Sequence, residues 1–186
     1  MDIPNYLFYS VIGPHGGETV EQILSRKEKE TKDAGYSLWA AKINKESIRR
    51  VWGLSKDDAV LVYCHINSRA NDPAEQSATA THMIGPKGKE LIADGITATF
   101  KETYSEQKPY QAYVVRRYHT LPETLKFDFE HYVSFTREGE VPFGERFRLK
   151  QFQNTFGQYN EDISCHEEKD IHVIMELQYP FVVNVF

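Results

Sequence analysis

The chain has 186 residues, of which 40% are hydrophobic and 26% charged, and its formal net charge is -5. This length is above the ~100–150 residues most common for one domain but is short for two full cores, so we expect a single domain over residues 1–186. A negative overall field repels phosphates, which excludes indiscriminate binding to polyanions. Any nucleic-acid role then requires a local basic groove.

The cysteine content and the N-terminus indicate a cytoplasmic protein. Cys64 and Cys165 can form at most one disulfide, whereas secreted domains that depend on disulfides are usually much richer in cysteine. Residues 1–5 lack a basic region followed by an apolar run, and no stretch approaches the ~18 apolar residues of a membrane span. We therefore expect no membrane partner, and folding without a disulfide, metal or cofactor.

The first strand and helix have clear local signals. Residues 6–12 are aromatic and β-branched and run into a Gly/Pro loop, which predicts a buried strand. A helix over about 19–34 follows, because Thr19 and Gln22 have the spacing of a capping box and Gly35 suits a left-handed C-terminal cap. The charged run within this helix mixes signs, which is typical of a solvated face.

The next segments repeat this alternation of strand and helix. Residues 36–43 predict a short strand that contains Trp39. Asn44 is placed to cap a second helix, over about 44–53, whose apolar residues share one face. The apolar run 59–66 has the length of a central strand.

The second half of the chain predicts a sheet. Turns rich in Gly, Pro, Asn and charges separate the expected strands at 77–84, 96–101, 111–118, 125–136, 146–152 and 170–178. The segment 125–136 alternates apolar and polar residues, as a half-buried antiparallel strand does, and it places His131 on the apolar face as a core histidine. We predict an α+β fold, a mixed, mostly antiparallel β-barrel flanked by the two early helices, with a β-rich C-terminal extension.

The Gly-rich segment 13–19 joins a strand to a helix N-terminus, where free N–H groups and the helix dipole favour an anion. Gly16, Gly17 and Thr19 are therefore candidate ligand-binding residues. The segment is not a P-loop, because no Lys-Ser/Thr follows and Glu18 places a negative charge where a phosphate would lie. A plain tight connection is the favoured interpretation, and an anion-binding loop is the alternative.

Signals for metal or covalent chemistry are weak. Cys64 and His65 are neighbours on an expected strand, so their side chains point to opposite faces and cannot both reach one metal. No Cys-x-x-Cys pair and no Gly-x-Ser-x-Gly elbow occurs. We predict no metal site and no catalytic residue, and an enzyme is the less favoured class.

The tryptophans are the more informative candidates. Aromatic side chains can stack on a base or another flat ligand, although large aromatics more often fill the core. Trp39 lies in the middle of its expected strand, whereas Trp52 ends the second helix. Trp39 is therefore the better ligand candidate.

The order of these elements resembles the front half of PUA-like barrels, particularly the EVE and ASCH branches. In those domains a tryptophan strand precedes a segment like residues 54–63 here, and the resemblance covers about residues 6–120. It implies that 77–84 is the next barrel strand and that Trp39 and Tyr63 belong to a pocket. Members of this group commonly bind RNA, and EVE-type members are thought to hold a modified, flipped base.

The resulting hypothesis is a binding module that recognises a nucleobase, nucleotide or short nucleic acid through an aromatic pocket. In this hypothesis Trp39 stacks on the base and Tyr63 belongs to the pocket. The basic residues that lie near Trp39 in sequence would contact the backbone of the nucleic acid; they are Lys42, Arg49 and Arg50. A solvated helix face explains these three basic residues equally well.

Two alternatives remain open. One is a small hydrolase or transferase that holds an anionic substrate in the Gly13–Thr19 loop, with His15 or His65 as acid/base. The other is an interaction protein, such as an inhibitor or adaptor of host or phage origin. An acidic chain with a long exposed loop is compatible with that role.

Overall fold

A single mixed sheet organises the protein, and the computed structural model describes residues 2–15, 17–67, 91–94, 97–100, 110–149 and 153–185 of it. The strands are β1 (Tyr6–Ile12), β2 (Ser37–Ala40), β3 (Val60–Ile66), β4 (Leu91–Asp94), β5 (Thr97–Phe100), β6 (Tyr110–Asp128), β7 (Tyr132–Thr136), β8 (Gly139–Pro142), β9 (Thr155–Tyr159) and β10 (Glu168–Val185). The helices in these residues are α1 (Val20–Ala34), α2 (Lys45–Trp52) and α3 (Phe143–Arg148).

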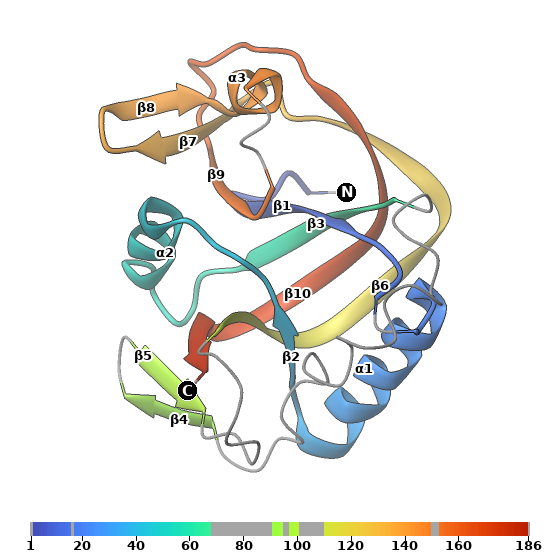
Figure 1. The fold of residues 1–186 in the computed structure, drawn as a ribbon. Helices are drawn as coiled ribbons and strands as arrows, with labels where there is room; N and C mark the ends of the chain where they lie inside the picture. The colour runs from blue at the N-terminus through green and yellow to red at the C-terminus, as the bar shows by residue number, and fades with distance from the viewer. Residues whose placement is uncertain are drawn as a thin grey trace.

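The strands follow the order β2-β6-β10-β3-β1-β9-β7-β8, and a β4–β5 hairpin joins the sheet through β5 on β10. β1 runs parallel to β3, and β5 parallel to the end of β10, while the remaining pairs are antiparallel. Figure 1 shows the long strands β6 and β10 crossing the whole molecule side by side. The predicted α+β class is confirmed. The barrel is not, because the path ends at β2 and β8 and the described sheet is not closed.

Local signals place α1 and α2 as predicted. The Thr19 hydroxyl accepts from the Gln22 backbone N–H while the Gln22 side chain accepts from the Thr19 N–H, which completes the capping box. Gly35 ends α1 in the left-handed conformation, with φ of 86°. The Asn44 side chain caps α2 by accepting from the Ser47 N–H at 2.9 Å.

Both faces of the central strands are covered. Alternate residues of β1 and β3 enter two separate apolar clusters, with Phe8 and Val62 in the first and Leu7 and Tyr63 in the second. The apolar faces of α1 and α2 cover the first cluster, and α3 covers the second. Figure 1 places α1 and α3 at opposite ends of the molecule.

Two predicted strands are wrong. The segment 125–136 is broken by a turn, because the Tyr132 N–H donates to the Phe129 carbonyl at 3.1 Å and β6 has already ended at Asp128. Residues 146–152 do not begin a strand, because α3 extends to Arg148. The predicted strand 77–84 lies outside the described residues.

The remaining general features concern the cysteines and membrane association. Cys64 and Cys165 are both free thiols, and burial raises the pKa of Cys64 well above its usual range. None of the helices that the structure describes has the length and apolarity needed to cross a membrane.

Candidate functional site

A pocket of about 280 Å³ opens between the end of β1, the first half of α1 and the strand β2. Its volume lies near the lower end of the ~300–1,000 Å³ typical of ligand sites, which suits one small ring system. Among the described residues, its lining consists of Val11, Ile12, Gly13, His15, Glu18, Ile23, Arg26, Lys27, Trp39, Ala40 and Gln153. The pocket thus brings together Trp39 and the Gly-rich loop, which the sequence suggested as two separate sites.

Trp39 lies between core and pocket. It is half-buried and packs against the first apolar cluster, where its ring centroid is 6.0 Å from that of Tyr118 at an interplanar angle of 52°. The same side chain lines the pocket. A flat ligand can therefore reach an indole whose orientation is already held by the core.

The loop from Gly13 to Thr19 is a tight turn. His15 and Glu18 exchange two backbone hydrogen bonds of 3.1 and 3.0 Å, and Gly17 takes φ of 76°, which favours glycine. Gly16 lies outside the described residues. The N–H groups of Thr19 and Gln22 are both engaged in the capping box. Fewer N–H groups are then free for an anion, so the geometry favours a connection over a phosphate cradle.

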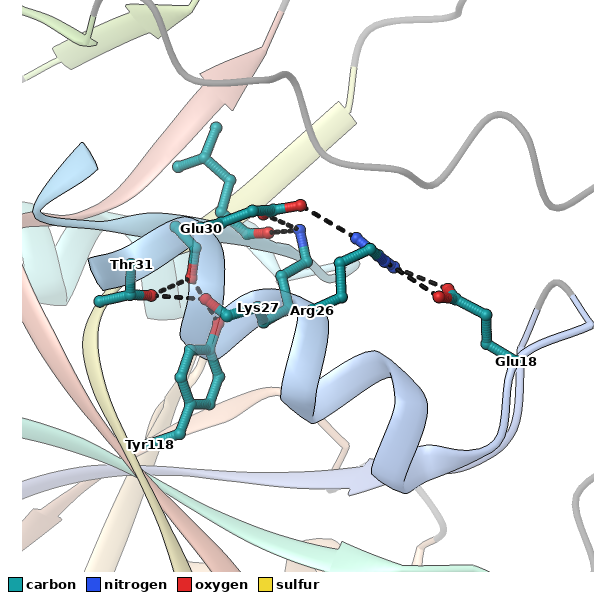
Figure 2. A network of polar contacts seen from close by, with 8 residues as sticks. Glu18, Arg26, Lys27, Glu30, Thr31 and Tyr118 are labelled. Carbon is teal, nitrogen blue, oxygen red and sulfur yellow. Dashed lines mark hydrogen bonds and ion pairs between the residues drawn. The ribbon is translucent and has the colours of Figure 1, made fainter. Parts of the chain in front are cut away.

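An arginine fixes this loop to α1, as Figure 2 shows. Arg26 donates two hydrogen bonds to the Glu18 carboxylate, at 3.0 Å from Nε and 2.8 Å from Nη2. A third, from Nη1, reaches Glu30 at 3.1 Å. The hydrogen bond from Arg26 lowers the pKa of Glu18, and the Glu18 carboxylate raises the pKa of Arg26. The wall of the pocket is thereby held rigid.

A buried lysine lies next to this pair. Lys27 is 3% exposed, and its ammonium donates to the Leu38 carbonyl at 2.6 Å and to the Glu30 carboxylate at 3.2 Å. Burial lowers the pKa of Lys27, and the charge of Glu30 opposes that shift. Lys27 therefore links α1 to the outer edge of β2 just beside Trp39.

Three hydroxyl groups extend this network from α1 toward Tyr118 (Figure 2). Thr31 Oγ1 is 2.8 Å from Ser37 Oγ, which in turn is 2.7 Å from the hydroxyl of Tyr118. Burial raises the pKa of Tyr118, so its hydroxyl stays protonated at neutral pH. Satisfied polar networks of this kind give a site one fixed shape.

His15 differs from its polar neighbours. Its Nε2 atom is buried and has no hydrogen-bond partner among the described residues, although the ring lines the pocket. Buried polar atoms in folded proteins almost always have a partner. A ligand in the pocket can form a hydrogen bond with His15 Nε2 if the imidazole turns toward it, because the ring lines the pocket while this atom is covered.

The other sequence-predicted site residues lie outside this pocket. Tyr63 is fully buried in the second apolar cluster, where its ring packs edge-on against Phe127. Arg50 lies over the Phe135 ring at 3.8 Å, and Arg49 pairs with Glu46 on α2. Lys42 follows β2, and its backbone carbonyl accepts from the Asn154 side chain at 3.3 Å.

Arg26 and Lys27 belong to the charged run of α1 that the sequence predicts to be a solvated face, so their place in the pocket wall was not predicted. A signal for Lys27 was present, because it is four residues after Ile23 and three after Leu24, on the apolar stripe of α1. The partnership of Arg26 with Glu18 had no such signal, since it depends on how the loop folds back on the helix.

One group with possible metal ligands occurs in the part of the chain that the structure describes: Asp128, Glu130 and His166. His166 Nδ1 is 2.8 Å from Asp128 Oδ2, and its Nε2 is 3.3 Å from Glu130 Oε1. The hydrogen bond to Asp128 and the charge of Glu130 raise the pKa of His166. A histidine held between an exposed and a half-buried carboxylate accounts for this arrangement.

Comparison of the chain with protein-family models, with curated proteins and with solved structures finds no match. The resemblance to PUA-like domains therefore stays a prediction. The function has to be argued from the pocket itself.

Proposed function

We propose that this protein is a binding module that holds the flat ring of a nucleobase, as a nucleotide, a nucleoside or part of a short nucleic acid, in the pocket beside Trp39. The observation that carries the proposal is the pocket itself, which opens against a half-buried indole. Part of the indole is therefore open to a ligand while the rest packs on the core.

The composition of the lining supports a planar, partly polar ligand. Trp39 offers an aromatic face, Ile12 and Ile23 offer apolar surface, and His15 offers an unpartnered nitrogen. A ligand pocket typically combines such apolar walls with a few fixed polar groups that orient the ligand. Stacking on an indole contributes about 1–3 kcal/mol per base.

A PUA-like architecture is part of this proposal. The early order of strand, helix, tryptophan strand, short helix and buried strand agrees with that resemblance. Closure of the sheet into a barrel would require a contact between its two ends, β2 and β8, that the described residues do not make. An experimental structure of the full chain tests this part.

Trp39 fluorescence tests the binding proposal. The chain has two tryptophans, so a Trp52→Phe variant, excited at wavelengths that tyrosine does not absorb, leaves Trp39 as the single emitter. We expect saturable quenching of that emission by nucleosides, nucleotides or short single strands, because stacking quenches indole. Trp39→Ala, in which only Trp52 emits, is the matched control and should show no response. Absence of quenching by every probe, with a folded Trp52→Phe protein, refutes the proposal.

One observation favours a second candidate, the small hydrolase or transferase. The His15 ring lines the pocket, its Nε2 has no partner among the described residues, and an imidazole is chemically suited to act as an acid or base. The described lining residues include no serine, cysteine or aspartate to act as nucleophile, and Glu18 is held by Arg26. Loss of turnover in His15→Ala, with binding retained, would favour this enzyme.

A stably co-purified protein partner, with no nucleobase binding, would favour the interaction protein.

A further inference from the structure

The charges around the pocket neutralise one another. Arg26 directs three guanidinium nitrogens to Glu18 and Glu30, and Lys27 shares Glu30 with it. Two cations thus face two carboxylates, and Lys27 also donates to a backbone carbonyl. A phosphate that entered would have to displace a carboxylate from a bidentate arginine pair, which breaks strong charge-assisted bonds.

The N-terminus of α1 offers little more to an anion. The backbone N–H groups of His15 and Glu18 are used within the turn, and those of Thr19 and Gln22 are used by the capping box. The Glu18 carboxylate also lies at this end of the helix and adds a negative charge. The pocket therefore has no group set aside for a phosphate among the described residues.

Besides the paired charges of Glu18, Arg26 and Lys27, the pocket borders the outer edge of β2. In the part of the chain that the structure describes, β2 is an end strand that pairs only with β6, and the Ala41 N–H donates to the Gln111 carbonyl next to that pair. Successive residues of a strand direct their backbone groups to opposite sides, so those of Leu38 and Ala40 face the open edge. The Leu38 carbonyl is taken by Lys27. Ala40 and the His15 ring both line the pocket, so the outward N–H and C=O of Ala40 belong to a residue at its wall.

We propose that the pocket selects an uncharged heteroaromatic base, as a free base or a nucleoside, over the corresponding nucleotide. Trp39 stacks on the ring, and the ring's polar edge exchanges hydrogen bonds with the Ala40 backbone and His15 Nε2. A heterocycle that carries both donor and acceptor groups fits this set, and a phosphate does not. This inference rests on the proposed function, because it concerns the same pocket.

Calorimetric titration of the full chain with four nucleosides and their 5′-monophosphates tests the selection. We expect each monophosphate to bind no more tightly than its nucleoside, and the nucleoside affinity to change less than about twofold with salt, since no phosphate contact is formed. A monophosphate that binds tenfold or more tightly, with affinity that falls as salt rises, would overturn the selection while leaving the base pocket standing. No binding of either series, with no Trp39 response, would overturn the pocket as well.

Substitution of His15 provides an independent readout. His15→Phe keeps a ring but removes the hydrogen bond, and should weaken the best nucleoside about three- to tenfold. His15→Gln keeps a polar nitrogen at similar reach and should stay within about twofold of the parent. Equal affinity in His15→Phe and the parent would remove His15 from the recognition set. Circular dichroism of both variants shows whether the fold is intact.

Discussion

Trp39 is placed so that its loss affects binding more than folding. Because its side chain is half-buried beside an open pocket, Trp39→Ala should weaken ligand binding by about 1–3 kcal/mol, the range for a stacking aromatic. Its cost in unfolding free energy should stay below the ~3–5 kcal/mol of a fully buried aromatic. Phe156→Ala, at a residue that is 1% exposed, is the control for that larger cost. Urea denaturation of both variants checks the comparison, and equal losses would make Trp39 a core residue.

His172 makes stability depend on pH at the edge between β3 and β10. Its Nδ1 accepts the Ile66 N–H at 2.8 Å, which a protonated nitrogen cannot do. Burial and the neighbouring His65 lower the pKa of His172 below its ordinary value of 6.5. The unfolded chain therefore binds the proton more readily, and stability should fall as pH falls below about 6.5.

The measurement is the unfolding free energy of the parent and of His172→Gln at about pH 7.5 and about pH 5. The glutamine side chain of this variant does not titrate, so the advantage of the parent over the variant should shrink at the lower pH. An advantage that is unchanged or larger at the lower pH would contradict the assignment.

At the scale of elements, the boundaries of α1 and α2 were predictable, whereas α3 and the later strand boundaries were not. Thr19, Gln22 and Gly35 act within a few residues, so their pattern alone fixes the ends of α1. The alternation over 125–136 looked like one strand, but the turn at Phe129 depends on the Glu167 carbonyl, which accepts the Phe129 N–H at 3.0 Å. Glu167 lies far along the chain, so the residues of the segment itself do not indicate this hydrogen bond.

The cap of α1 can be tested directly. Thr19→Ala removes the hydroxyl that accepts the Gln22 N–H at 3.2 Å and should cost about 0.5–2 kcal/mol of unfolding free energy. Thr19→Ser keeps the hydroxyl and should stay close to the parent. Equal losses in both variants would show that the methyl group, not the cap, stabilises this end of the helix. Thermal denaturation resolves the difference.

Gly144 tests the tight contact between α3 and the segment after β9. A Cβ at this position would lie 2.7 Å from Cys165 Sγ and 2.9 Å from the Cys165 carbonyl oxygen. Gly144→Ala should destabilise by about 1–3 kcal/mol, although alanine is the better helix former by about 1 kcal/mol. Gly53→Ala is the control, because its nearest contact is at 3.4 Å. A stabilising Gly144→Ala would show that the segment moves aside freely.

At the scale of the molecule, β10 connects the parts of the sheet. It pairs with β3, β5 and β6, and both apolar clusters include residues from it. Met175→Ala, at a residue that is 0% exposed, should cost about 2–5 kcal/mol. Within each protein, the near- and far-ultraviolet circular dichroism signals should be lost at one common denaturant concentration, and that concentration should be lower for the variant than for the parent. Two separate midpoints would indicate two independently folding units.

The candidate site was predictable only in part for a reason of topology. Trp39 and the Gly13–Thr19 loop were each visible as local patterns, but the pocket that residues of both line depends on how β1, α1 and β2 pack in the folded chain. The resemblance predicted Tyr63 in the same pocket as Trp39. Because alternate residues of β3 point to opposite faces of the sheet, the Tyr63 side chain instead lies in the second apolar cluster. Long-range packing therefore decided which of the aromatic candidates reached the pocket.

The central claim, that a base stacks on Trp39, is tested most directly by the two indole N–H signals in a proton–nitrogen NMR spectrum. Trp52 is an internal reference, because its Nε1 donates to the Val182 carbonyl at 2.9 Å, away from the pocket lining. On addition of a nucleoside, the Trp39 signal should shift progressively and saturate while the Trp52 signal stays in place. Two signals that remain unmoved at saturating nucleoside, or a shift of Trp52 alone, would contradict the account.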